Sequence, residues 1–178
     1  MEVITKKDDV LGTKLISLTR VFELNDKDEQ VKAEIDPSCI EGVFGASSKA
    51  VARGAASRIV MKSGYNFTVA EQVYDVVSKR KEALGIVDFS NFIKEDDEGA
   101  ALRTISLTRV FDTLRDGVEE VVAAILPSQI ECMFGASEDA QEIGASSQVI
   151  MKSGYTFYAR QSAQEVKKMR DEALGLKP

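Results

Sequence analysis

The chain has 178 residues, with 23 lysines and arginines against 29 aspartates and glutamates, two cysteines, no tryptophan and no histidine. This length fits one domain of average size or two very small ones. Without histidine, the chain lacks the usual general base and metal ligand of neutral pH. Two cysteines are too few for a disulfide framework or a four-thiolate zinc site. With no histidine to activate them, Cys39 and Cys132 are expected to be small buried residues. The composition therefore argues against an enzyme and indicates a cytoplasmic protein with no cofactor and no metal.

The two halves of the chain are copies of each other. Identical segments recur 89 or 90 positions apart: Ile16–Phe22 as Ile105–Phe111, Phe44–Ser47 as Phe134–Ser137, and Met61–Tyr65 as Met151–Tyr155. The repeat divides the chain into an N-terminal extension (1–13), copy one (14–86), an acidic connector (87–102) and copy two (103–178). Because units of this size have small cores, we expect the copies to pack on each other or on copies from other chains.

The first half of each copy is predicted to form three strands. In copy one, apolar residues alternate with polar ones over Ile16–Phe22 and again over Val31–Asp36, which is typical of half-buried strands. The apolar run Ile40–Phe44 predicts a third strand. A loop rich in Gly, Ala and Ser follows over 47–57. Copy two repeats this pattern.

The second half of each copy is predicted to form a hairpin and a helix. Two strand-like runs, Arg58–Lys62 and Tyr65–Val69, flank a connection that contains Gly64, as in tight hairpins. A helix is expected over 70–84, with Gly85 at its end. The predicted fold is α+β: two tandem antiparallel β-meanders of four to five strands, each closed by a C-terminal helix.

A set of short motifs, best preserved in copy two, resembles the FlbD family of small flagellar-operon proteins, whose relatives also occur in phage genomes. The matching residues are Ile105–Arg109, Ile130, Val149–Met151, Gly154, Ser162 and Glu165 with Val166, together with their counterparts in copy one. The chain departs from the family in its duplication, in its long loop, and in Gln72 and Asp75 at the helix start of copy one. The resemblance implies an interaction role in a bacterial or phage setting and carries over no catalytic residues.

The charges of the two Gly/Ala/Ser-rich loops are opposite. Copy one and the rest of 1–86 are neutral overall, and the connector accounts for most of the net charge of −6. The loop of copy one carries only bases and that of copy two only acids: Lys49, Arg53 and Arg58 against Glu138, Asp139 and Glu142. Charge drift on solvated loops explains this difference, but so does complementary docking between copies, within a chain or head to tail between chains.

A second set of candidates would bind a ligand. It comprises two arginines in the opening strands, two lysines beside the hairpin turns and the tyrosines next to them: Arg20, Arg109, Lys62, Lys152, Tyr65 and Tyr155. Guanidinium groups suit phosphates and carboxylates, and a base can stack on an aromatic ring. The competing interpretation is structural, with the arginines in ion pairs with Glu41 and Glu131 and the tyrosines packed in the hairpins.

The first hypothesis for function is a non-enzymatic assembly or adaptor protein, cytoplasmic or virion-associated, that contacts other proteins as a homo-oligomer or larger assembly. The alternative is a binding module for single-stranded nucleic acid or a small anionic nucleotide, since Whirly proteins are also built from repeated strand-rich units that end in a helix. Neither half is net basic, which disfavours nucleic acid. No apolar run approaches the roughly 18 residues that cross a bilayer, so no membrane partner is expected.

Overall fold

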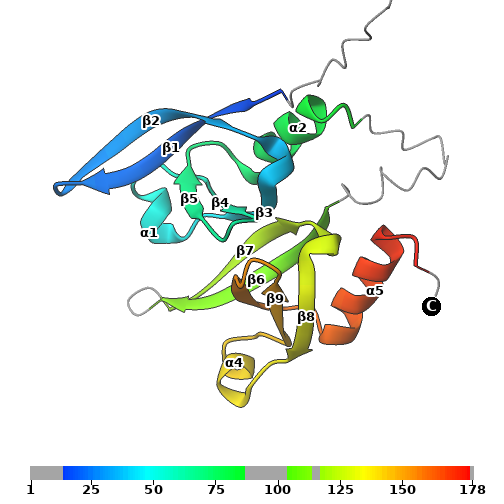
Figure 1. Ribbon diagram of the computed structural model, residues 1–178. Coiled ribbons are helices and arrows are strands. Elements are labelled where there is room, and N and C mark those ends of the chain that lie inside the picture. The colour runs from blue at the N-terminus through cyan, green and yellow to red at the C-terminus, as the bar shows by residue number, and fades with distance from the viewer. Residues whose placement is uncertain (1–13, 87–103, 114–116, 177–178) are drawn as a thin grey trace, which may run out of the picture.

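The computed structural model describes residues 14–86, 104–113 and 117–176 (Figure 1). The predicted N-terminal extension (1–13) and the whole of the acidic connector (87–102) lie outside these residues. The elements of copy one are β1 (Ile16–Leu24), β2 (Lys27–Ile35), η1 (Pro37–Cys39), β3 (Ile40–Gly45), α1 (Ser48–Val51), β4 (Ser57–Met61), β5 (Asn66–Val69) and α2 (Val73–Ala83). Those of copy two are β6 (Ile105–Thr113), β7 (Gly117–Ile125), η2 (Pro127–Gln129), β8 (Ile130–Gly135), α4 (Glu138–Glu142), β9 (Ser147–Met151), β10 (Thr156–Ala159) and α5 (Ala163–Ala173).

Local sequence explains most of these elements. The β1–β2 turn places Asn25 and Asp26 at φ of 50° and 58°, as a two-residue hairpin turn of type I′ requires. Gly64 supplies the positive φ of the β4–β5 hairpin. At the start of α5, Ser162 and Glu165 form the reciprocal hydrogen bonds of a capping box. The predicted strands and closing helices are therefore present in both copies.

The prediction of two separate meanders, each closed by its own helix, was wrong. All ten strands belong to one antiparallel sheet with the order β2-β1-β5-β4-β3-β7-β6-β10-β9-β8. The two copies join because β3 of copy one pairs antiparallel with β7 of copy two. Figure 1 shows this junction at the centre of the molecule, with copy one above it and copy two below.

The strand order within a copy also differs from a simple meander. In copy one, β2 and β3 lie at opposite ends of the order, yet only η1 and one preceding residue connect them. The five strands must therefore curl so that the two outer strands approach each other at this corner. The short helices α1 and α4 within the loops were not predicted, because four or five residues are too few to show a helical period.

The two closing helices cover opposite faces of the joined sheet. In copy one, Val76 of α2 packs with Val43 and Ile59. Val43 lies opposite Ala124 of β7, whereas Ala123, on the other face, belongs to the core that α5 covers in copy two. We call the face of each copy that its closing helix does not cover the outer face. The face under α2 therefore continues as the outer face of copy two, and α1 packs on the outer face of copy one.

Candidate interaction surfaces at the sheet edges

The junction between the copies is a strand pairing with a short register. Three residue pairs lie opposite each other: Gly42 with Ile125, Val43 with Ala124, and Phe44 with Ala123. The backbone N–H of Leu126 also donates to the carbonyl of Glu41, at 3.0 Å. Backbone hydrogen bonds supply the pairing, and side chains on both faces determine its specificity.

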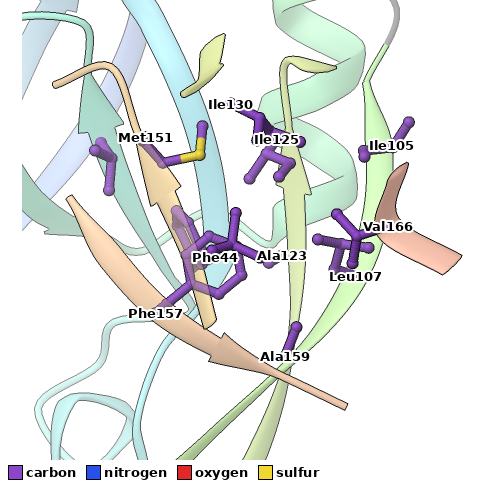
Figure 2. Close-up of a cluster of buried hydrophobic side chains, with 12 residues drawn as sticks. Phe44, Ile105, Leu107, Ala123, Ile125, Ile130, Met151, Phe157, Ala159 and Val166 are labelled. Atoms are coloured by element: carbon purple, nitrogen blue, oxygen red, sulfur yellow. The ribbon is translucent and has the colours of Figure 1, made fainter. Parts of the chain in front are cut away.

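Phe44 anchors the junction by entering the core of copy two. Its side chain is fully buried, and its ring centroid lies 5.2 Å from those of Tyr155 and Phe157. The guanidinium of Arg109 lies 5.7 Å from the same ring. Figure 2 shows Phe44 beside Phe157 and close to Ala123, among residues that otherwise belong mainly to copy two. One aromatic side chain of copy one therefore completes the core of copy two.

A buried carboxylate forms a second contact across the junction. Glu41 is only 1% exposed and accepts hydrogen bonds from the backbone N–H of Ser153, at 3.3 Å, and from its hydroxyl. Burial raises the pKa of the Glu41 carboxyl, while the hydrogen bonds from Ser153 and the positive charge of Lys62 oppose this rise. The β9–β10 turn is thereby held against β3.

Two glycines allow the strands to approach closely. A Cβ added to Gly45 would lie 2.8 Å from the Cβ of Val121. One added to Gly42 would lie 3.0 Å from Cγ2 of Ile125. Beyond the strand, Ser48 of α1 donates its backbone N–H to Glu119 of β7 at 2.9 Å, and its hydroxyl bonds to the same carboxylate. A larger side chain at Gly42 or Gly45 would therefore require neighbouring atoms to shift.

The same surfaces recur, uncovered, at the two ends of the sheet. By the repeat, β8 corresponds to β3 and β2 corresponds to β7, and both are outermost in the strand order. Phe134, the counterpart of Phe44, is 53% exposed. On the other edge Val31, the counterpart of Val121, is 44% exposed, and Tyr65, the counterpart of Tyr155, is 54% exposed. One end of the sheet therefore exposes the counterpart of β3, and the other end exposes the counterpart of β7.

The predicted ligand-binding arginines and tyrosines do come together, copy by copy. The Arg20 guanidinium lies 5.1 Å from the ring centroid of Phe22 and 6.0 Å from that of Tyr65. The Arg109 guanidinium lies 5.9 Å from the ring centroid of Tyr155, and burial lowers its pKa. In the part of the chain that the structure describes, neither arginine forms an ion pair with a carboxylate. These contacts are cation–π packing.

The two lysines of that set lie apart from this packing. Lys62 and Lys152 are exposed in the hairpin turns. A ligand-binding role for the six residues stays a prediction.

The two oppositely charged loops do not meet within residues 14–86, 104–113 and 117–176. Arg53 pairs instead with Glu23 and Asp28 at the end of the β1–β2 hairpin. Lys49 and Arg58 line a pocket under α1. The three acids of copy two are exposed on or at the end of α4: Glu138, Asp139 and Glu142. Docking between the loops of two chains stays a prediction.

Sequence reasoning missed the residues that make the junction. Phe44 and Ser153 both lie in segments that the two copies share, but identity between copies does not show which copy is covered. Glu41 was considered only as a partner for an arginine. The two cysteines, predicted to be buried, are exposed at Cys39 and half-buried at Cys132. The sequence feature that could have indicated the junction is the repeated Phe-Gly pair, Phe44-Gly45 and Phe134-Gly135, at the end of the third strand of each copy.

No protein-family model matches this chain, and the search of curated proteins also finds no match. The resemblance to the FlbD family therefore stays a prediction. Among the described residues, no cluster of cysteine and carboxylate side chains could hold a metal ion. None of the described helices is both long enough and apolar enough to cross a membrane.

Proposed function

We propose that this protein is a non-enzymatic assembly protein whose chains join head to tail, with β8 of one chain pairing with β2 of the next. One observation carries the proposal: the β3–β7 junction joins two different surfaces of the repeat, and the counterpart of each surface lies uncovered at one end of the sheet. A contact of this kind is heterologous and leaves two complementary ends after each addition. Its successive additions form a ring where the rotation closes and a filament where it does not.

The residues that anchor the inner junction have counterparts on the open edges. Phe134 would enter copy one of the next chain beside Tyr65 and Phe67, as Phe44 enters copy two beside Tyr155 and Phe157. Glu131 would reach Ser63, as Glu41 reaches Ser153. The receiving strand keeps the same pattern, with valine, alanine and isoleucine at alternate positions in both copies: Val31, Ala33 and Ile35 against Val121, Ala123 and Ile125.

On the other face of the sheet, the side chains of the inner junction differ from their counterparts at the open edges. In the inner junction, apolar residues of α2 and β7 line a groove of about 670 Å³, among them Val73, Tyr74, Val77, Val122 and Ala124. Their counterparts in α5 are Ala163, Gln164 and Lys167, and those in β2 are Lys32 and Glu34. Two lysines, one glutamine and one carboxylate thus replace apolar or aromatic side chains on the two surfaces that would meet. This matched change favours a polar junction between chains and an apolar one within the chain.

Two substitutions make the junction between chains weaker than the inner one. Cys132 replaces Gly42, where an added Cβ contacts an isoleucine. Glu138 replaces Ser48 and would face Glu29, the counterpart of Glu119, so a hydrogen bond becomes a repulsion between like charges. We therefore expect reversible association that increases with protein concentration.

Sedimentation velocity over a range of concentrations tests the proposal. The wild-type chain is expected to gain mass stepwise, and Phe134→Ala is expected to weaken association at least tenfold because the anchor is lost. Tyr74→Ala is the matched control, because Tyr74 is 79% exposed but lies away from both open edges. A wild-type chain that stays monomeric at millimolar concentration would contradict the proposal.

A second variant gives the open edge of β8 the residues that β3 and α1 use in the inner junction. Cys132→Gly combined with Glu138→Ser gives β8 and α4 the residues of copy one. Because the steric and electrostatic obstacles are removed, this variant is expected to associate more tightly than the wild type. Unchanged or weaker association would show that β8 does not use the geometry of β3.

A charge-reversal variant separates edge pairing from loop docking. In the repeated geometry, α4 would lie over β2 of the next chain, as α1 lies over β7. Arg53 pairs with Asp28 of β2 and is therefore kept, so combined reversal of Lys49 and Arg58 to glutamate should leave association by edge pairing unchanged. Weakened association in the same sedimentation experiment would instead favour docking between the loops.

A further inference from the structure

A pocket lies under α1 on the outer face of copy one. Its volume is about 260 Å³, and it opens between α1 and the strands β1, β4 and β5. Lys49, Arg53 and Arg58 line one part of the pocket, and Thr68 and Ala50 line another. Three cationic side chains from two elements and the loop between them therefore converge on one hollow.

Copy two fills the same place with apolar side chains. Ile143 stands at the position of Arg53, and Tyr158 stands at the position of Thr68. Both pack against the buried residues under α4, which include Val110, Ala140 and Ala145. The repeat thus shows that this fold does not need the hollow, and that copy one differs from copy two in shape and in charge at the same site.

The positive charge of the pocket is only partly compensated by the protein. Arg53 is held by the carboxylates of Glu23 and Asp28. Within the described ranges, Lys49 and Arg58 form no ion pair, and Arg58 has only a hydrogen bond of 3.4 Å to the side-chain carbonyl of Asn66. The charge of Arg58 also adds to burial in lowering the pKa of Arg109. An anion in the pocket would neutralise this uncompensated charge and would weaken the repulsion between Arg58 and Arg109.

We propose that this pocket binds a small phosphate-bearing anion. A lysine and two arginines match the charge and the hydrogen-bonding geometry of phosphate oxygens. The apolar lining from Val21, Ala50 and Ala55 would contact a short organic group. The volume lies just below the range of about 300–1,000 Å³ typical of pockets for drug-sized ligands, so the ligand class is a small phosphomonoester.

Isothermal titration of the full chain with glycerol phosphate and with inorganic phosphate tests this site. Saturable binding with a submillimolar Kd for glycerol phosphate is expected for the wild type. Lys49→Gln combined with Arg58→Gln should weaken it at least tenfold. Arg53→Ile combined with Thr68→Tyr, which installs the residues of copy two, should abolish binding without lowering the melting temperature, because copy two already accommodates these side chains.

A charge-matched control is Lys14→Gln combined with Lys168→Gln, which removes two exposed lysines outside the pocket. Equal weakening by this control and by the pocket variant would indicate general electrostatic attraction and would overturn the proposal. No binding at 10 mM glycerol phosphate would overturn it too, as would binding that survives in the filled variant. Arg53 pairs with Asp28 of the edge strand β2, so association is compared only for Lys49→Gln combined with Arg58→Gln, which leaves that ion pair intact.

Discussion

The strands β3 and β8 share their sequence pattern and their local conformation but differ in what covers them. Phe44 on β3 is fully buried by copy two, whereas Phe134 on β8 is 53% exposed. Gly45 lies against Val121, whereas a Cβ added to Gly135 meets no atom within 4 Å. Because the local fold is the same, these differences in burial and in packing arise from the presence or absence of a neighbouring strand.

The largest expected effect is that of removing the anchor. Phe44→Ala should lower the free energy of unfolding by about 3–5 kcal/mol, because it leaves a cavity in the core of copy two. Phe134→Ala should change it by no more than about 0.5 kcal/mol in dilute solution, where the edge is uncovered. Urea denaturation at low protein concentration measures both. Similar losses for the two variants would break the comparison between β3 and β8.

A smaller effect, opposite in sign between the copies, is expected at the glycines. Gly45→Ala should destabilise the chain by about 1–3 kcal/mol, because the new methyl group meets Val121. Gly135→Ala should be neutral or should stabilise the dilute chain by up to about 1 kcal/mol, because it restricts the unfolded state. Thermal unfolding distinguishes the two. The same Gly135→Ala chain should associate more weakly in sedimentation, since its methyl group would meet Val31 of the next chain.

The smallest effect concerns the pH dependence of stability. Burial raises the pKa of Glu41 above the ordinary value of about 4.3, so the folded chain binds this proton more tightly than the unfolded chain. The penalty for the buried charge is therefore absent below about pH 4.3, grows as the pH rises through the raised pKa, and is complete above it. Compared with the wild type, Glu41→Gln should gain stability between pH 4 and pH 7.

The matched control for this pH effect is Glu131→Gln, since Glu131 is exposed on β8. Denaturation of both variants at several pH values should show the trend for Glu41→Gln alone. A parallel trend in the control would mean that the pH dependence does not arise at the junction. An absent trend in both would mean that Glu41 keeps an ordinary acidity despite its burial.

Much of each copy could be predicted because its signals are local. Alternating residues in Ile16–Phe22, the glycine of the β4–β5 hairpin and the capping box at Ser162 each act within a few positions. The junction could not be predicted in the same way. Phe44 and Phe134 occupy identical sequence contexts, so nothing near either residue shows which is buried. Likewise, the pocket under α1 depends on the tertiary packing that brings Arg53 and Thr68 into the lining of one hollow.

The amino-acid sequence by itself determined the duplication, the strands and the closing helix of each unit, since periodicity and turn residues specify the conformation of neighbouring positions. Only the tertiary structure decided that the two units share one sheet, that their helices lie on opposite faces, and that one surface of each kind stays open. The physical reason is that every strand edge offers the same N–H and C=O groups. Which edges pair therefore depends on the shapes that distant residues form together.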